Sequence, residues 1–334
     1  MKASVIKRFG QPNVFETVEL PVPTVPPKHI LIRVAATSVN PVDTKVREGA
    51  VGDIAPDFPA VLHGDVAGTI AAIGEGVTEF NIDDEVYGCA GGVKGTGGAL
   101  AEYMIADAAL IALKPRSLTM MQAAALPLVS ITAWEGLIDR AQVQPGQKVL
   151  VYGGTGGVGH IGLQLAKWAG ATVYATVSSE EKAAIARELG ADVTINYHQT
   201  PVEEFVVEHT DGQGFDVVFD TVGDDNLQNA FRAAKLNGTV VSLVSLSHQD
   251  LTHLHVKGLT LHLVFMLLPM LSGINRDRHS KILKQVAQLV DEKKLRPLLD
   301  AHSFLFTDAA AAHTRAESGK AIGKVVLEQS LAAI

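Results

Sequence analysis

The spacing of apolar residues changes along the chain, and from Lys148 onward it predicts strands that alternate with helices. Short apolar runs rich in β-branched residues indicate the strands, which are KVLVYG, ATVYATV, DVTIN, FDVVFD, GTVVSLV and GLTLHLVF. Helical stretches such as EEKAAIARELG and DNLQNAFRAAKL separate most of these runs. Six strands in this arrangement predict an α/β fold with a doubly wound parallel sheet, which we place at residues 118–265.

The residues on either side of this block have a different pattern. Before residue 118 the chain is β-rich: HILIRVAATSVN alternates apolar and polar positions, and shorter apolar runs broken by Gly and Asp follow. After Pro269 the pattern indicates a charged helix, a strand (HSFLF), another helix and a final strand (GKVVLEQ). We therefore expect residues 1–117 and 266–334 to form one domain, assembled from both ends of the chain.

Two segments need a more specific interpretation. The stretch SLTMMQAAALPLVSITAWEGLIDRA has helical character, and Ser117 is the expected N-cap. The most apolar run is Gly258 to Leu271, which contains His262 and Pro269 and is too short to span a bilayer. We interpret it as a buried strand that leads into a loop or helix.

Composition and charge restrict the possible partners and location. Hydrophobic residues make up 47% and charged residues 19% of the 334, which is typical of a large core and argues against disorder. The net charge of −8 argues against nucleic acid as the main partner. The N-terminal segment lacks an apolar signal region, and Cys89 is the one cysteine, which fits a reducing compartment. We expect a cytoplasmic protein that does not associate with membranes.

The glycines that follow the first predicted strand of the parallel sheet form a G-x-G-x-x-G motif before a helical stretch. In this motif the first glycine, Gly154, permits a tight turn. The second, Gly156, lets the backbone approach a pyrophosphate, and the third, Gly159, lets the helix pack on the strand. The helix N-terminus offers N–H groups to phosphates. The alternative is a glycine turn selected only for packing. The expected dinucleotide-binding residues of this loop are Gly154, Thr155, Gly156, Gly157, Val158 and Gly159.

The end of the second strand predicts which dinucleotide binds. Sites that prefer NAD usually carry an acid there for the ribose hydroxyls, whereas this strand ends at Val177 and Ser178. Lys182 follows one helical turn later, and Tyr197 closes the next strand. A hydroxyl, an ammonium and a phenol can surround a 2′-phosphate, which a carboxylate would repel. Lys182 could also be an ordinary surface lysine. We expect NADPH.

Several motifs together resemble the zinc-free quinone oxidoreductase branch of the medium-chain dehydrogenase/reductase superfamily. They include ATSVNPVDTKVREG, PAVLHGDVAGTIAAIGEGV, ALPLVSITAWEGL, VYGGTGGVGHIGLQLAK and the terminal GKVVLE, so the resemblance covers nearly the whole chain. It implies a GroES-like catalytic domain from both chain ends, a Rossmann domain between them and an active site in the cleft. It also implies use of NADPH, with 2′-phosphate contacts at Ser178, Lys182 and Tyr197, and Lys324 of the terminal motif among the cofactor-binding residues.

The positions of the zinc ligands in metal-dependent relatives carry other residues here. The first ligand position falls on Asn40 and the third near Leu128. The relatives have Gly-His-Glu in the middle, whereas this chain has His63-Gly64-Asp65, so the histidine comes one residue early. Zinc needs three or four good ligands. We therefore expect no metal, and we interpret His63 as a hydrogen-bonded loop residue.

The candidate catalytic residues are Asn40, Asp43 and Thr132. Asn40 could hydrogen-bond the nicotinamide ribose or a substrate carbonyl, or could simply be a turn residue before a proline. Asp43 could orient the same loop or cap the turn, and Thr132 could line the nicotinamide pocket. We interpret Asp220 as a strand-end cap and Arg47 as a surface or loop charge.

The expected activity is therefore reduction of a quinone or an α,β-unsaturated carbonyl compound (an enone) by NADPH without zinc. Two alternatives remain open: a metal-dependent alcohol dehydrogenase of the same fold, and a non-catalytic protein that binds NADPH. A homodimer is also expected, because the apolar strand at Gly258–Phe265 would lie at the edge of the sheet and could pair with its own copy.

Overall fold

The computed structural model of the chain describes residues 1–245 and 247–331, which form two compact units. The second unit contains Val129–Met266 and Lys294–Arg296. The first contains Met1–Leu128, Leu267–Lys293 and the residues from Pro297 onward, so it is built from both ends of the chain. The helix Met120–Ala124 (α2) packs on strands of the first unit. The unit boundary at Leu128 therefore lies after this helix, whereas the sequence pattern changes at residue 118.

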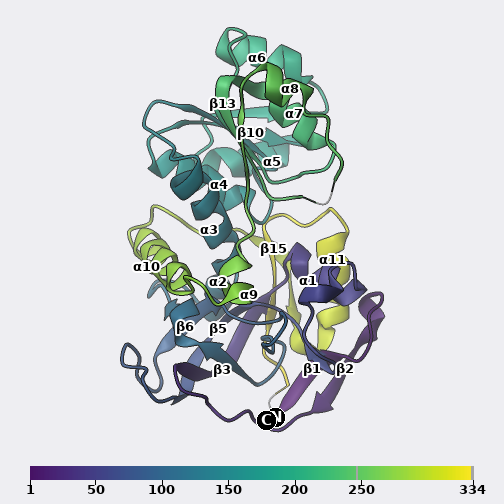
Figure 1. The fold of residues 1–334 in the computed structure, drawn as a ribbon, viewed down its shortest axis with the longest axis vertical. Coiled ribbons are helices and arrows are strands. Elements are labelled where there is room, and N and C mark those ends of the chain that lie inside the picture. Colours follow the sequence, from purple (N-terminus) through teal and green to yellow (C-terminus); the bar gives the residue numbers. More distant parts are fainter. Residues whose placement is uncertain (246, 332–334) are drawn as a thin grey trace. The chain divides into compact units, whose positions relative to one another are not determined.

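The second unit is a parallel sheet of six strands in the order β11-β10-β9-β12-β13-β14 (Figure 1). Every strand pairs in parallel with its neighbours. The expected doubly wound α/β sheet is therefore confirmed. The strands are β9 (Lys148–Tyr152), β10 (Thr172–Val177), β11 (Val193–Asn196), β12 (Phe215–Asp220), β13 (Ala234–Ser242) and β14 (Thr260–Leu263).

Helices connect these strands and cover the sheet. Tyr174, Phe205, Phe215 and Phe231 pack together in the core on one side of the sheet, and the rings of Tyr174 and Phe215 meet edge to face at 5.0 Å. The helices are α3 (Pro127–Trp134), α4 (Gly159–Trp168), α5 (Glu180–Glu188), α6 (Val202–Thr210), α7 (Asn226–Ala233) and α8 (Thr252–Val256). The strand order reverses at β9, between β10 and β12, which is where such sheets bind nucleotides at the carboxyl ends of their strands.

The first unit contains a seven-stranded sheet and a three-stranded sheet, β2-β1-β4. In the larger sheet the C-terminal strand β16 pairs antiparallel with β3 from the N-terminal part of the chain. Yellow and purple elements therefore lie side by side in Figure 1. The strands are β1 (Lys2–Ile6), β2 (Phe15–Glu19), β3 (His29–Ser38), β4 (Ala60–Val61), β5 (Asp65–Ile73), β6 (Glu85–Cys89), β7 (Tyr103–Asp107), β8 (Ile111–Leu113), β15 (Leu299–Leu305) and β16 (Lys324–Glu328).

One helix of the first unit begins directly after a predicted site residue, Asn40. This is α1, which follows β3 directly and starts one residue after Asn40. The others come from after residue 118, and the last three belong to the C-terminal segment. The helices are α1 (Pro41–Glu48), α2 (Met120–Ala124), α9 (Leu268–Ser272), α10 (Asp277–Asp291) and α11 (Ala309–Glu317).

Two local predictions were wrong. Thr119, not Ser117, caps α2: its hydroxyl accepts from Gln122 N at 3.3 Å, and Gln122 Oε1 accepts from Thr119 N at 3.0 Å. This T-x-x-Q pair forms a reciprocal capping box. Ser117 instead donates its N–H and its hydroxyl to Asp291, at 3.0 and 2.8 Å. The apolar run after Gly258 is not a buried strand, because β14 is short and lies at the sheet edge, where Leu263 is 46% exposed.

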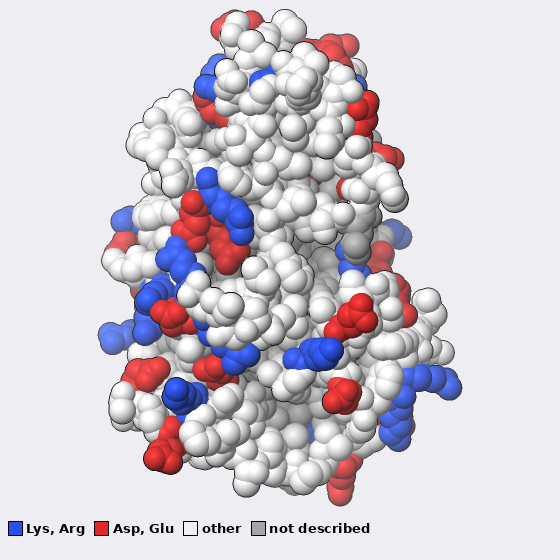
Figure 2. Space-filling model, viewed as in Figure 1, with Lys and Arg blue, Asp and Glu red and all other residues white. Residues whose placement is uncertain are grey.

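The surface shows no strong separation of charge on the face in Figure 2, where Lys and Arg side chains alternate with Asp and Glu. Among the described residues, no helix is both long and apolar enough to cross a bilayer.

The close approach of α4 to β9 predicts a specific sensitivity at Gly159. A Cβ atom at this position would lie 2.0 Å from the carbonyl oxygen of Gly153. Gly159→Ala should therefore destabilise the second unit by about 2–3 kcal/mol, as overpacking does, and lower its melting temperature by several degrees. Thermal unfolding followed by circular dichroism measures this. Gly97→Ala is the control, because nothing lies within 4 Å of its added Cβ; equal melting temperatures for both variants would contradict the prediction.

Candidate cofactor and catalytic site

The glycine loop begins at the carboxyl end of β9, at the point where the strand order reverses. The motif suggested that Gly154 makes the tight turn. In the structure the residue with left-handed backbone is Gly153, with a φ of +71°. Gly156 N donates to Gly153 O at 2.9 Å, and this bond closes the turn. At Gly159 the helix lies too close to the loop for any side chain, which agrees with the packing role expected for the third glycine.

The start of α4 follows the glycine turn directly, and its amides His160 N and Gly162 N donate to Gly156 O at 3.1 Å and to Val158 O at 2.9 Å. The helix begins at Gly159, and Val158, the residue before it, has no side-chain group that could cap the first N–H groups. Thr155 and Gly157 complete the turn between β9 and the helix. A glycine turn at a helix N-terminus is the arrangement that binds a pyrophosphate, so the geometry fits the expected dinucleotide.

The carboxyl end of β10 brings the predicted 2′-phosphate residues to one edge of the unit. Ser178 directly follows β10, and Tyr197 directly follows the neighbouring strand β11. Tyr197 N donates to Val177 O at 3.2 Å, which joins the two strand ends, and the Tyr197 side chain is 49% exposed. Lys182 lies in the first turn of α5, where its N–H is capped by Ser179 Oγ at 3.3 Å.

The two acids of the same turn do not replace the missing strand-end carboxylate. Glu180 and Glu181 are exposed, and Glu180 forms an ion pair with Arg187 at 2.5 Å. The side chains that follow the two strand ends thus offer a hydroxyl, an ammonium and a phenol, and of the two acids Glu180 is paired with Arg187.

A second group of polar residues is buried in the first unit around the start of α1. Asn40 is the N-cap residue, and its N–H donates to Asp43 Oδ2 at 2.7 Å. Asn40 Nδ2 donates to Asp65 Oδ2 at 2.8 Å, and Asn40 Oδ1 accepts from Lys324 Nζ. Lys324 Nζ also donates to Val39 O at 2.9 Å. The structure thus brings together three predicted site residues, Asn40, Asp43 and Lys324.

Asp65 links this group, and sequence reasoning did not identify it. Its Oδ1 accepts from Leu128 N at 2.8 Å and its Oδ2 from Ser38 Oγ at 2.7 Å, in addition to Asn40. Lys324 Nζ lies 3.6 Å from Oδ2. The signal in the sequence was an acid at the start of an otherwise apolar strand, β5. These donors offset part of the cost of burying the Asp65 carboxyl group.

Burial changes the acid–base properties of this group. It raises the pKa of Asp43 to about 7, and the nearby Asp65 carboxylate adds to the effect. It also lowers the pKa of the Lys324 ammonium, which the two carboxylates partly oppose, and raises that of the Cys89 thiol well above its usual range. Asp43 therefore exchanges its proton near neutral pH, whereas Asp65 has the hydrogen bonds that hold a negative charge.

Two of the three residues at the expected zinc-ligand positions bond to the same carboxylate. Asn40 and Leu128 both donate to Asp65, so a carboxylate joins the first and third positions. His63 does not face this group: its Nε2 lies 2.9 Å from His313 Nε2, and its Nδ1 lies 3.3 Å from Thr37 Oγ1. Among the residues described, no group of three or more His, Cys, Asp and Glu side chains is placed to hold a metal ion.

Three other residues singled out in the sequence, Thr132, Asp220 and Arg47, lie outside the group around Asp65. Thr132 is a buried residue of α3 in the second unit, and its catalytic role stays a prediction. Asp220 accepts from Val222 N and Gly223 N, each at 3.1 Å, and therefore caps the end of β12, as expected. Arg47 is not a surface or loop charge: its side chain is fully buried in α1.

Comparisons with known proteins agree with both units. Residues 26–116 match the family described as the alcohol dehydrogenase GroES-like domain, and residues 189–327 match the zinc-binding dehydrogenase family. The NADPH-dependent alkenal/one oxidoreductase, chloroplastic, of Arabidopsis thaliana is 33% identical over 98% of this chain and 79% of its own length.

Solved structures have the same fold throughout. An alcohol dehydrogenase superfamily protein from Novosphingobium aromaticivorans superposes with a TM-score of 0.93 at 38% identity, over 98% of this chain and 99% of its own. The quinone oxidoreductase of Pseudomonas syringae pv. Tomato DC3000 has a TM-score of 0.87 at 30% identity over the same shares. The chain therefore belongs to the zinc-type alcohol dehydrogenase-like medium-chain dehydrogenases/reductases, among the alkenal/one and quinone oxidoreductases.

Proposed function

We propose that the protein is an NADPH-dependent reductase of quinones or α,β-unsaturated carbonyl compounds and that it works without zinc. The observation that carries this proposal is the glycine loop at the switch point of the sheet, beside a strand end that has no acid for the ribose hydroxyls. The named activities of the Arabidopsis and Pseudomonas relatives support the class of acceptor.

The residues at the zinc-ligand positions favour an acceptor that needs little charge stabilisation. Reduction of a simple ketone places charge on an alkoxide, which a metal would stabilise as a Lewis acid. Here an amide and a leucine backbone N–H at those positions are bonded to Asp65, and this donor set does not suit zinc. A conjugated acceptor spreads the charge over its own atoms, so positioning and one or two hydrogen bonds are sufficient.

We assign roles to the chain's own residues on this basis. NADPH supplies the hydride, and the glycine loop, Ser178, Lys182 and Tyr197 bind its phosphates. Asn40 is held within the buried group through one amide hydrogen and its carbonyl oxygen, and we assign its side-chain amide to the oxygen of the acceptor. Thr132 lines the nicotinamide pocket, and Asp43 keeps Asn40 in place by capping its N–H. Lys324 binds the cofactor only indirectly, because its ammonium is turned toward Asn40.

A panel of acceptors tests the activity and Asn40 together. NADPH oxidation should be fast with quinones or enones, slow with simple ketones and unaffected by chelators. Asn40→Ala should lower kcat/KM for the enone roughly 10-fold, which corresponds to one hydrogen bond in the transition state. Efficient oxidation of simple alcohols that disappears on chelation would favour the metal-dependent alternative. NADPH binding without any turnover would favour the non-catalytic one.

The choice of cofactor depends on Lys182. Lys182→Ala should raise the KM for NADPH roughly 10-fold, because a charge-assisted bond to the 2′-phosphate is lost, and should leave the KM for NADH nearly unchanged. Lys167→Ala is the control, since Lys167 is a half-exposed lysine of the same unit that pairs with Asp192. A wild-type preference for NADH, or an equal loss with both cofactors, would contradict the assignment.

We also propose a homodimer through Gly258–Phe265, because β14 is the last strand of the sheet and its outer edge has no partner strand among the described residues. Light scattering should give the mass of two chains at micromolar concentration. Leu263→Lys should shift the mass to one chain, because it places a charge on the apolar edge. Val207→Lys, at an exposed position of α6, should leave the dimer intact; a monomeric wild type would exclude the proposal.

A further inference from the structure

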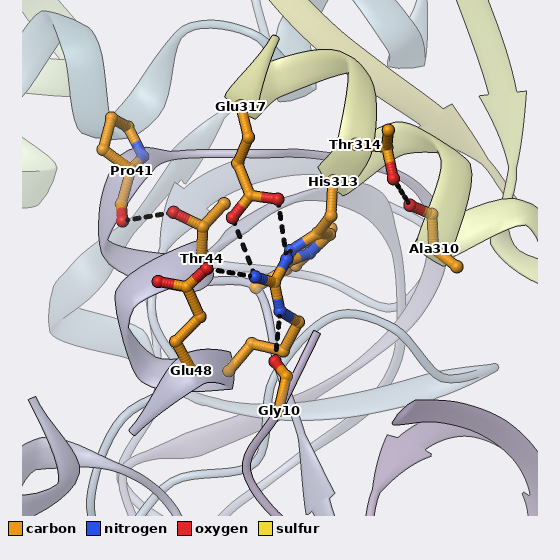
Figure 3. A network of polar contacts seen from close by, with 10 residues as sticks. Gly10, Pro41, Thr44, Glu48, Ala310, His313, Thr314 and Glu317 are labelled. Atoms are coloured by element: carbon orange, nitrogen blue, oxygen red, sulfur yellow. Dashed lines mark hydrogen bonds and ion pairs between the residues drawn. The ribbon is translucent and has the colours of Figure 1, made fainter. Parts of the chain in front are cut away.

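Arg47 is held in a single orientation inside the first unit. Its Nε donates to Gly10 O at 3.0 Å. Its Nη1 donates to His313 Nδ1 at 3.2 Å and to Glu317 Oε2 at 3.1 Å, and its Nη2 donates to Glu48 Oε1 at 2.7 Å and to Glu317 Oε1 at 2.8 Å. All five N–H groups of the guanidinium thus have an acceptor, and the planar fork fixes their directions. Figure 3 shows Glu317 and His313 of α11 on one side of this network and Glu48 and Gly10 on the other.

The guanidinium fixes the proton positions of the two histidines behind it. Because Arg47 has no acceptor, His313 Nδ1 must accept, and the proton of His313 is therefore on Nε2. That proton faces His63 Nε2 at 2.9 Å, so His63 carries its own proton on Nδ1, toward Thr37 Oγ1 at 3.3 Å. Thr37 then donates to the main-chain oxygen of Asp65 at 2.5 Å. A directed chain of hydrogen bonds runs from Arg47 to Asp65.

This chain requires both imidazoles to be neutral. Burial lowers the pKa of His63 well below its ordinary value, and His313 and Lys324 add to the effect. Burial, with the adjacent Arg47, lowers the pKa of His313 to about 3. The charged groups around the pair are Arg47 with its two glutamate partners on one side and Lys324 with Asp65 on the other, and the ring of Phe15 covers His313. A second proton on either ring would set two N–H groups against each other.

Both ends of the hydrogen-bond chain act on the same helix. Arg47 lies in the last turn of α1, and Asn40 caps the first turn. The chain ends at the main-chain oxygen of Asp65, and the carboxylate of the same residue accepts from the Asn40 amide at 2.8 Å through Oδ2. We propose that Arg47, His313 and His63 are positioning residues, which lock α1 to the C-terminal helix α11 and so keep Asn40 aligned for the acceptor. The role of Asn40 in this inference rests on the proposed function, whereas the attachment of α1 to α11 through Arg47, His313 and His63 (the lock) does not.

Two substitutions of His313 distinguish loss of its hydrogen bonds from loss of a neutral side chain at this position. His313→Gln keeps one acceptor for Arg47 and one donor for His63 but cannot take up a proton, whereas His313→Leu removes both. We expect His313→Leu to lower kcat with the enone roughly 10-fold at neutral pH and to leave the KM for NADPH within about 2-fold. His313→Gln should restore kcat to within about 3-fold of the wild type. Equal kcat values for the wild type and His313→Leu would overturn the proposal.

A variant on the same helix controls for a general loss of stability. Arg315 of α11 forms a bidentate pair with Asp300, at 3.1 and 2.9 Å, and has no bond to the chain described above. Arg315→Lys should weaken the attachment of α11 and leave kcat unchanged at a temperature where circular dichroism shows all variants folded. If it lowered kcat as much as His313→Leu, the effect would be one of helix stability and the positioning role would fail.

The pH profile and nuclear magnetic resonance test the lock independently. The kcat of the wild type should fall reversibly as the pH drops toward about 3, because His313 must then accept a proton, and the fall should move to lower pH in His313→Gln. Imidazole ¹⁵N signals should show His313 protonated on Nε2 and His63 on Nδ1, both neutral at pH 6. Reversed tautomers or a charged ring at pH 6 would overturn the lock. The absence of enone or quinone turnover by the wild type would instead overturn the proposed function. The ¹⁵N signals would then still show whether the hydrogen-bond chain through the two histidines exists.

Discussion

The buried carboxylate of Asp65 is the interaction on which the organisation of the first unit depends. It accepts from a backbone N–H, a hydroxyl and an amide, and it lies 3.6 Å from the Lys324 ammonium. Isolated in an apolar interior, such a charge would be very unfavourable, and each of these donors offsets part of that cost. This carboxylate therefore holds together strand β5, the start of α1, the first turn of α3 and the C-terminal strand.

The second unit depends on a different constraint, the absence of side chains. The carbonyl oxygen of Gly153 occupies the space that a Cβ of residue 159 would need, so the helix can approach the strand only as a bare backbone. The same approach points the helix N-terminus at the carboxyl edge of the sheet, beside the ends of β10 and β11. Packing and phosphate binding thus use the same few glycines, which explains why the motif is so dense.

Patterns within short segments were sufficient to predict the architecture. The six strands of the parallel sheet and the β-rich character of the first part followed from periodicity, because burial on one or both faces of a strand determines the spacing of its apolar residues. Asp65 and Arg47 were missed or misread for the opposite reason. Their partners, such as Glu317 and Lys324, lie far away in the sequence, and a single charged residue in an apolar stretch does not show what will neutralise it. The cap at Thr119 was missed because Ser117 and Thr119, two residues apart, offered similar signals, and only the position of Gln122 distinguished them.

The pairing of β16 with β3 also has a consequence for the order in which the protein folds. Lys324 binds the carbonyl oxygen of Val39 across 285 residues, so the partner of the N-terminal strands is synthesised long after them. The nucleotide-binding unit is encoded between them, and its contacts are closer in sequence, so it can fold while the first unit still lacks its final strand. Until then Asp65 has no counter-charge from Lys324, and α1 has no helix α11 to bind. The N-terminal strands must therefore wait in an incomplete sheet, which makes synthesis the stage at which this chain is most exposed to misassembly and to chaperones.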